Sequence, residues 1–287
     1  MVFGKRGQIA WELQRSLAVL GEVKAVGSDE VCFSRPDEVV SALREYRPDF
    51  VVNACGYTAV DKAEDEEQLA SIINGHSVGV LAEEARKLNI PLVHYSTDYV
   101  FDGSKSGAYL ESDEPSPINA YGRSKLLGEK LIQQVGGRHA ILRVSWVYGA
   151  RGANFYRTML RLGEEREELA VVDDQIGAPT WCRHLSDGTV HVLKGMHKSD
   201  ISGIFHLTPQ GQTSWCGFAS EIFRLNHEHA QKCTLRIESV KAIKTAEYPT
   251  RAKRPLNSVM SSGKIADAFG IELPHWSTSL RLVSELG

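Results

Sequence analysis

Residues 90–99 read Ile-Pro-Leu-Val-His-Tyr-Ser-Thr-Asp-Tyr, and residues 121–125 read Tyr-Gly-Arg-Ser-Lys. The first stretch begins with an apolar run that predicts a buried strand, with the hydroxyl of Thr97 at its carboxyl end. Open α/β sheets bind their ligands at that end of the strands. The second stretch places Tyr121 and Lys125 four residues apart, on one face of a predicted helix. Together the two stretches predict a ligand site at one edge of a parallel sheet.

The residue types at this site indicate proton transfer to a carbonyl group. An ammonium beside a phenol favours the phenolate, so Lys125 is expected to lower the pKa of Tyr121 from its usual value of about 10. A tyrosine poised in this way gives a proton to a carbonyl oxygen or takes one from an alcohol. This chemistry is typical of carbonyl reductases that use a nicotinamide cofactor. The spacing alone is weak evidence, because a buried tyrosine followed by a solvated lysine gives the same pattern.

Composition and charge exclude several classes of partner. The chain has 287 residues, of which 42% are hydrophobic and 24% charged, as expected for one large or two modest globular domains. Its net charge of −3 provides no broad basic field, so we expect no nucleic-acid partner. No apolar stretch reaches the roughly 18 residues of a membrane span, so we expect no membrane partner. The scattered cysteines indicate reduced thiols, from which we expect a cytoplasmic location.

The cysteines and histidines predict no metal site. The five cysteines are scattered, never spaced as Cys-x-x-Cys, and are interpreted as reduced thiols. The one local cluster of metal-ligand types, His227-Glu228-His229, is interpreted as a polar helix end. The cysteines are Cys32, Cys55, Cys182, Cys216 and Cys233.

Short apolar runs alternate with helical patterns through the first two-thirds of the chain. Strands are predicted near residues 23–26, 50–53, 90–95, 140–144 and 204–207. This rhythm predicts βαβ units and an α/β fold, a Rossmann-like doubly wound parallel sheet with a smaller mixed α/β substrate-binding lobe. We expect a dinucleotide-binding domain over residues 1–150, to which the chain returns near 181–207. Residues 151–287 are expected to form mainly the substrate-binding lobe.

Residues 4–10, Gly-Lys-Arg-Gly-Gln-Ile-Ala, are similar to a glycine-rich phosphate loop at the start of a helix. Glycines there let backbone N–H groups approach a pyrophosphate. The acidic residue expected about 20 positions later is replaced by Gly27. Its loss removes a repulsion against a 2′-phosphate, which Lys5 or Arg6 could bind. The sequence therefore favours NADPH as cofactor, with NADH as the alternative.

With these motifs placed, the chain resembles the extended short-chain dehydrogenases/reductases and, among them, the dTDP-4-dehydrorhamnose reductase family. The resemblance covers essentially the whole chain, with its motifs in family order and at family spacing. The segments that carry it are residues 4–8, 11–14, 52–54, 58–64, 94–101, 121–125, 143–148, 154–155, 174–180, 206–207 and 254–258.

The resemblance implies reduction of the C4 ketone of dTDP-4-dehydro-β-L-rhamnose to dTDP-L-rhamnose. It implies that Tyr121 protonates the C4 oxygen, that Lys125 lowers the pKa of Tyr121 and binds the nicotinamide ribose, and that Thr97 holds the carbonyl oxygen. The cofactor-binding residues that it implies are Gly4, Gly7, Gln8, Ile9, Cys32, Phe33, Gly56, Tyr57, Thr58, Tyr95, Tyr121 and Lys125. The substrate-binding residues that it implies are Thr97, Asp98, Tyr121, Trp146 and Arg254.

The sequence also departs from the family pattern. The family usually has an acidic residue at Gly27 and an Asp at Cys32, both of which contact the adenosine. Some relatives bind Mg²⁺ at a dimer contact, and Glu12 and Glu285 match two of those positions. Arg183 falls at a third and brings a positive charge there. We therefore expect no metal-bridged dimer, while another kind of homodimer is left open.

Several alternatives remain at this stage. Trp146 could be core packing, Gly56 could simply end a strand, and Arg254 could cap a helix. The chain could be a non-catalytic regulatory subunit like that of methionine adenosyltransferase, which shares this fold and much of this motif set. It could also be another nucleotide-sugar reductase or epimerase, although the Ser-Thr-Asp-Tyr segment at 96–99 favours the reductase.

Overall fold

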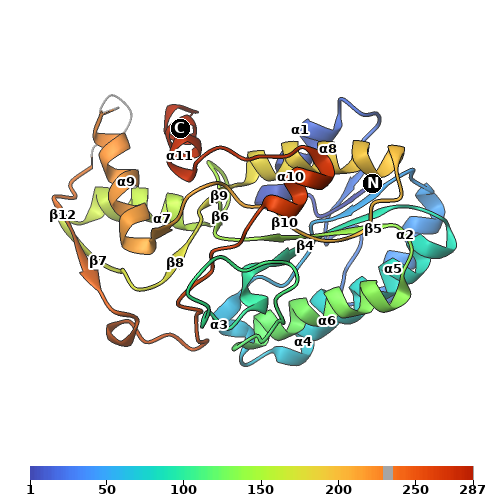
Figure 1. Cartoon of the computed structure of the whole chain (residues 1–287), viewed down its shortest axis with the longest axis horizontal. Helices are drawn as coiled ribbons and strands as arrows, with labels where there is room; N and C mark the ends of the chain where they lie inside the picture. Colours follow the sequence, from blue (N-terminus) through green and yellow to red (C-terminus); the bar gives the residue numbers. More distant parts are fainter. Residues whose placement is uncertain (229–234, 287) are drawn as a thin grey trace.

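The structure is a computed structural model that describes residues 1–228 and 235–286. Its centre is a six-stranded parallel sheet in the order β10-β5-β4-β3-β1-β2 (Figure 1). The chain adds β2 on one side of β1 and β3 on the other, so the strand order reverses at β1. This confirms the predicted doubly wound sheet and marks the point where such sheets bind ligands. The strands are β1 Val2–Phe3, β2 Ala25–Val26, β3 Val51–Asn53, β4 Leu92–Thr97, β5 His139–Val144 and β10 Gly203–His206.

Helices cover both faces of the sheet (Figure 1). Successive strand residues point to opposite faces, so Val52 and Val93 pack in one core cluster while Val51 and Leu92 pack in another. The first core includes residues of α1 Gln8–Leu17, α8 Cys182–Lys198 and α10 Gly263–Phe269. The second includes residues of α2 Pro36–Tyr46, α5 Ser77–Lys87 and α6 Ala120–Val135.

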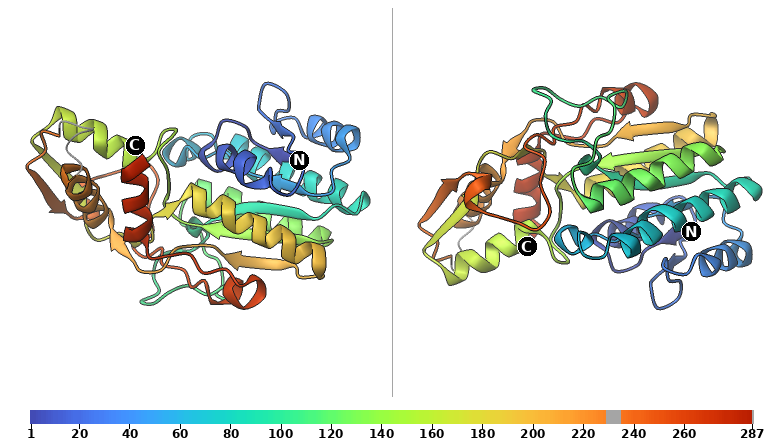
Figure 2. Two further views of the ribbon diagram at one scale, coloured as in Figure 1. Left: turned by 90° about the horizontal axis from the view of Figure 1, so that it is seen from above. Right: turned by 90° about the horizontal axis from the view of Figure 1, so that it is seen from below.

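A second lobe lies beyond the carboxyl ends of the strands (Figure 2). Its core gathers aromatic and aliphatic side chains from helices α7, α9 and α11. The helices are α7 Phe155–Glu165, α9 Trp215–Glu228 and α11 Trp276–Leu286. The paired strands are β6 Val147–Tyr148 with β9 Thr180–Trp181, β7 Glu168–Val172 with β12 Ser239–Ile243, and β8 Ile176–Gly177 with β11 Thr213–Ser214.

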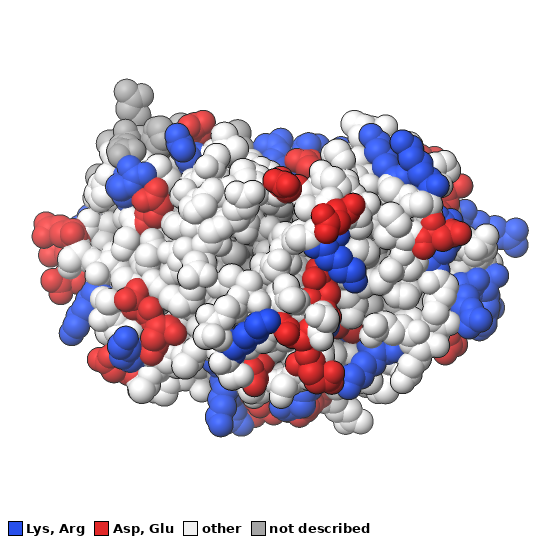
Figure 3. Space-filling model, viewed as in Figure 1, with Lys and Arg blue, Asp and Glu red and all other residues white. Residues whose placement is uncertain are grey.

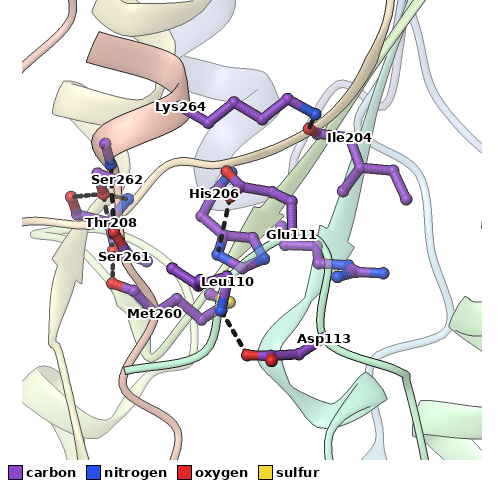
Figure 4. Close-up of polar contacts among 12 residues, drawn as sticks. Leu110, Glu111, Asp113, Ile204, His206, Thr208, Met260, Ser261, Ser262 and Lys264 are labelled. Atoms are coloured by element: carbon purple, nitrogen blue, oxygen red, sulfur yellow. Dashed lines mark hydrogen bonds and ion pairs between the residues drawn. The ribbon is translucent and has the colours of Figure 1, made fainter. Parts of the chain in front are cut away.

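Two outward backbone groups of the edge strand β10 are hydrogen-bonded to side chains (Figure 4). The amide of His206 donates to the Glu111 carboxylate at 2.8 Å, and the Lys264 ammonium donates to the carbonyl of Ile204 at 2.8 Å. An edge with free N–H and C=O groups pairs readily with other strands. Strand β10 itself pairs with β5 in parallel. The residue ranges of the two predicted domains, including the return of the chain near 181–207, remain a prediction.

The face seen in Figure 3 carries lysine and arginine interspersed with aspartate and glutamate, with no field of a single sign. Within residues 1–228 and 235–286, no helix is long and apolar enough to cross a membrane. Cys32, Cys55, Cys182 and Cys216 are free thiols. Cys233 and His229, the latter part of the predicted polar helix end, lie outside the described residues.

Candidate active site

A cavity of about 570 Å³ lies at the carboxyl ends of the central strands, between the sheet and the second lobe. Most of the predicted site residues line it, so the fold brings them together from segments far apart in the sequence. The predicted residues among its walls are Gly7, Gln8, Ile9, Gly56, Thr58, Tyr95, Thr97, Asp98, Tyr121, Lys125 and Trp146. The predicted residues outside its walls are Gly4, Cys32, Phe33, Tyr57 and Arg254.

The glycine-rich loop has the geometry of an anion-binding turn. Gly4 has a φ of +108°, and a Cβ atom added there would lie 3.2 Å from the carbonyl oxygen of Ala54. Helix α1 starts directly after Gly7, and because glycine has no side chain, the N-cap residue makes no side-chain hydrogen bond to the first amides of the helix. Backbone N–H groups at such a helix start attract phosphate oxygens. Gly4 therefore shapes this loop through its backbone conformation, although it does not line the cavity.

Helix α6 presents Tyr121 to the cavity. The Asn119 side chain caps the helix by accepting from the amide of Gly122 at 2.7 Å. A Cβ atom added at Gly122 would lie 2.1 Å from the carbonyl oxygen of Tyr99, so only glycine allows the helix to start this close to β4. The ring of Tyr99 meets that of Tyr121 edge to face at 5.8 Å. These contacts fix the phenol beside the end of the strand that carries Thr97.

The pKa of Tyr121 differs from the sequence-based expectation. Burial raises it to about 12, a hydrogen bond with Thr97 lowers it, and the charge of Asp98 raises it. The lowering expected from Lys125 is not found in this structure. The Lys125 ammonium instead donates to the carbonyl of Tyr95 at 2.6 Å. Tyr121 therefore carries its proton at neutral pH, as a proton donor must.

Lys125 is fully buried beside a neutral histidine. Asn53 accepts from the amide of Cys55 through Oδ1, so its Nδ2 donates to Nδ1 of His94 at 3.0 Å. The other ring nitrogen of His94, Nε2, lies 3.2 Å from the Lys125 Nζ atom. Burial and the charge of Lys125 hold the pKa of His94 well below its ordinary value. Burial also lowers the pKa of Lys125 to about 8, so this amine titrates close to neutrality.

Thr97 and Asp98 form the polar end of strand β4. The Thr97 hydroxyl donates to the Asp98 carboxylate at 2.9 Å and accepts from the amide of Tyr99 at 3.2 Å. Burial raises the pKa of Asp98 to about 6, against lowering by the hydroxyls of Ser258 and Thr97. Asp98 is the first residue of the 3₁₀ turn η2 (Asp98–Val100) and lies in the wall of the cavity.

An indole pair closes the opposite wall. Trp146 has a φ of +46°, and its ring stacks on that of Trp215 with centroids 3.6 Å apart and planes 7° apart. A Cβ atom at Gly177 would lie 2.4 Å from the Trp146 ring, so a glycine there makes room for the indole. Trp146 thus faces the cavity rather than serving only the core. Sequence reasoning missed Trp215, because its partner lies 69 positions away and no motif surrounds it.

The predicted adenosine contacts do not converge on the cavity. The Phe33 ring is buried in the core against Phe3, with centroids 5.4 Å apart. The Cys32 thiol contacts the Ser34 hydroxyl at 3.0 Å. The residues after β2 turn toward α2 and the core, and the contacts of Cys32 and Phe33 with the adenosine remain a prediction. Tyr57 is also directed elsewhere, donating through its hydroxyl to Glu66 at 2.8 Å.

Arg254 is held in a bidentate ion pair with Asp61. Both Nη atoms lie 2.6 Å from the carboxylate oxygens, and Nη1 also donates to the carbonyl of Ala252 at 2.6 Å. Asp61 belongs to the short helix α3 Val60–Ala63, whose Val60 lines the cavity. Arg254 therefore lies beside the site without entering its walls.

Two of the three positions discussed for a bridging metal, Glu12 and Arg183, form an ion pair with each other. The Glu12 Oε2 atom lies 3.8 Å from Nε of Arg183 and 3.0 Å from Nε of Arg15. Within the described part of the chain, no group of three or more His, Cys, Asp or Glu residues is arranged to hold a metal ion.

Comparison with known proteins gives a consistent result over the full length. The family model described as the RmlD substrate binding domain matches residues 1–286. The dTDP-4-dehydrorhamnose reductase of Burkholderia thailandensis is 47% identical over 287 residues, covering 98% of this chain and 96% of that protein. That of Escherichia coli K12 is 44% identical over 294 residues, covering 100% and 97%. The crystal structure of the Bacillus anthracis dTDP-4-dehydrorhamnose reductase in complex with NADP superimposes with a TM-score of 0.90 at 33% identity, covering 100% of this chain and 98% of that one.

Proposed function

This chain belongs to the dTDP-4-dehydrorhamnose reductase family, and from that premise we propose that it reduces dTDP-4-dehydro-β-L-rhamnose to dTDP-L-rhamnose with NADPH. The observation that carries the proposal is the convergence of Thr97, Tyr121 and Lys125 in one cavity of a chain that matches this family end to end. The enzyme is thus an oxidoreductase of dTDP-rhamnose biosynthesis.

The cavity fits a dinucleotide. Its walls include the start of helix α1, where Gly7 and Gln8 offer backbone N–H groups to a pyrophosphate. Gly56 and Thr58 lie across from that loop, at the end of β3, and Tyr95 lies on β4. When bound, NADPH supplies the hydride for the ketone carbon. The residues of the chain supply the proton and the electrostatic environment.

Tyr121 is the proposed proton donor to the C4 oxygen. Its high pKa keeps it protonated until the oxygen gains negative charge, which makes the transfer favourable. The Thr97 hydroxyl holds that oxygen by turning its proton from the Asp98 carboxylate to the substrate. The buried ammonium of Lys125 stabilises the charge that develops beside it. The proposed role of Lys125 therefore includes a direct electrostatic effect in addition to contact with the nicotinamide ribose.

Asp98 and Trp146 are the proposed contacts to the sugar, and Trp215 extends the Trp146 surface. Arg254 is kept as the proposed diphosphate contact, which requires it to exchange its Asp61 partner for the substrate. Cys32 and Phe33 are kept as proposed neighbours of the adenosine only through their backbone, since the Phe33 ring is buried.

The remaining expectations concern the molecule as a whole. The division into a cofactor domain (1–150) and a substrate lobe (151–287) stays a prediction. A cytoplasmic location is supported by the family and by the free thiols among the described residues. A homodimer without a bridging metal is also a prediction. The regulatory-subunit and epimerase alternatives are not favoured, because the full-length relatives are named as reductases.

The decisive test is the loss of NADPH absorbance on addition of dTDP-4-dehydro-L-rhamnose generated in situ. The parent enzyme is expected to oxidise NADPH rapidly, and the Tyr121→Phe variant almost not at all. If the folded parent binds NADPH without oxidising it, the proposed substrate is wrong.

A further inference from the structure

The structure brings a carboxylate to the end of β2 although the residue there is glycine. Residues 27–30 form a tight turn in which the amides of Glu30 and Val31 donate to the carbonyl of Gly27 at 3.0 and 2.8 Å. The turn folds Asp29 back, so that a Cβ atom added at Gly27 would lie only 2.4 Å from Asp29 Oδ1. Gly27 thus makes room for the carboxylate that its own position lacks.

Two cations of the phosphate loop are paired with this turn. Arg6 lies 2.9 Å from Asp29, and Lys5 lies 2.9 Å from Glu30. Glu30 has Lys24 as a second partner at 3.5 Å. Arg6 is also part of the cavity wall, which connects the charged turn to the cofactor site. Since Arg6 and Asp29 are 78% and 52% exposed, their ion pair is weak and can be exchanged for contacts with a ligand.

Resting on the proposed function, we propose that Asp29 accepts the hydroxyls of the adenosine ribose and that its exchangeable pair with Arg6 sets the preference between NADH and NADPH. A free 2′-hydroxyl donates to the Asp29 carboxylate and leaves the pair with Arg6 intact. A 2′-phosphate is repelled by Asp29 and takes Arg6 as its partner, so the pair must open.

The charges around the turn make both arrangements accessible. Lys5, Arg6 and Lys24 supply three positive charges against two carboxylates, which leaves an excess for a phosphate. Glu30 is held by two lysines and by a 3.5 Å contact from the amide of Gly27. Asp29 is therefore the carboxylate of this turn that is freer to meet a ribose. On this proposal the enzyme binds both cofactors. Loss of either the Asp29 carboxylate or the Arg6 guanidinium changes the ratio of their dissociation constants.

The test is equilibrium binding of NADPH and NADH by calorimetric titration, without sugar nucleotide, to the parent, Asp29→Asn and Arg6→Gln. For Asp29→Asn we expect tighter NADPH and weaker NADH binding, so that the ratio of the two dissociation constants moves about tenfold or more toward NADPH. For Arg6→Gln the ratio moves by a similar factor toward NADH. Asp187→Asn is the matched control, because Asp187 forms an exposed pair with Arg15 at 2.8 Å, away from the cavity.

The inference is overturned if Asp29→Asn changes both dissociation constants by one common factor, or if Asp187→Asn moves their ratio as far. Turnover does not enter this measurement. A shifted ratio in an enzyme that fails to reduce the sugar would uphold the inference and reject the proposed function. A parent that binds neither dinucleotide would reject both.

Discussion

The two ends of the cavity are built from opposite kinds of interaction. At the Tyr121 end, the side chains of Thr97, His94 and Lys125 are buried. The Lys125 ammonium on α6 donates to the carbonyl of Tyr95 on β4 at 2.6 Å. At the Arg6 end, exposed side chains form ion pairs between neighbouring loops. Buried polar contacts are costly to break, whereas exposed ion pairs are screened by water and salt. The first end can fix the chemistry, and the second can adjust the choice of cofactor.

Replacement of Tyr121 tests the buried end most strongly. Tyr121→Phe removes the proton donor, so kcat should fall by about 10²–10⁴-fold while NADPH binding changes little. Arg6→Gln should give the converse result, with a changed cofactor affinity and a preserved kcat. Steady-state kinetics and calorimetric titration measure the two effects separately. Tyr148→Phe is the control for loss of a buried hydroxyl, because the Tyr148 hydroxyl has no hydrogen-bond partner in the described structure and lies outside the cavity.

The buried ion pair between Glu129 and Arg143 should contribute more to the free energy of unfolding than the exposed ion pairs do. Glu129 on α6 and Arg143 on β5 are both 1% exposed and form a bidentate pair, at 3.0 and 2.7 Å. Glu129 also accepts from the Ser96 hydroxyl at 2.5 Å. Glu129→Gln leaves a guanidinium uncompensated in the interior, so the free energy of unfolding should fall by about 3–5 kcal/mol. Urea denaturation measures this loss, and a fall of less than about 1 kcal/mol would show that the pair is not needed.

Titration of Lys125 should appear in the pH profile. Burial lowers its pKa to about 8, so its ammonium is present below that pH and is lost as pH rises through it. The value of kcat/KM for NADPH reports the free enzyme and should fall about tenfold per pH unit above pH 8. Arginine keeps its charge at these pH values, so Lys125→Arg should have lower activity but no such alkaline limb. An unchanged alkaline limb in that variant would assign the titration to another group.

An exposed ion pair between Arg123 on α6 and Glu67 on the short helix α4 (Glu67–Ser71) should have the smallest effect on the free energy of unfolding. Arg123 and Glu67 form a bidentate pair at 2.7 and 3.0 Å, and their side chains are 44% and 46% exposed. Glu67→Gln should change the free energy of unfolding by less than about 1 kcal/mol, and less still in high salt. Denaturation at two salt concentrations beside Glu129→Gln gives the contrast directly. A cost equal to that of Glu129→Gln would contradict the expected difference between buried and exposed ion pairs.

The sequence predicted the buried end well because its signals are local. An apolar run marks β4, and the spacing of Tyr121 and Lys125 marks one face of α6. The Lys125 contact to the Tyr95 carbonyl could not be predicted from the sequence, because it depends on how α6 packs across β4. The pKa of Tyr121 was mispredicted for the same reason, since burial outweighs any effect of a lysine that is directed elsewhere.

The exposed end was harder to predict because it depends on a turn. Sequence alone showed that Gly27 lacks a carboxylate, but the return of Asp29 over it is a property of the backbone of residues 27–30. Likewise, the position of Phe33 in the core reflects the path of the chain into α2. Trp215 was missed since its role arises from the approach of α9 to the end of β5.

The stacked indoles of Trp146 and Trp215 belong to different lobes, one following β5 and the other beginning α9. Rings 3.6 Å apart and nearly parallel couple their electronic transitions, and that coupling decays as the rings separate or rotate. The coupled absorption of the two indoles is therefore an intrinsic spectroscopic signal of the distance and orientation between the two lobes. Circular dichroism in the indole absorption bands, followed during a titration, would report without any added label whether ligands draw the lobes together or force them apart.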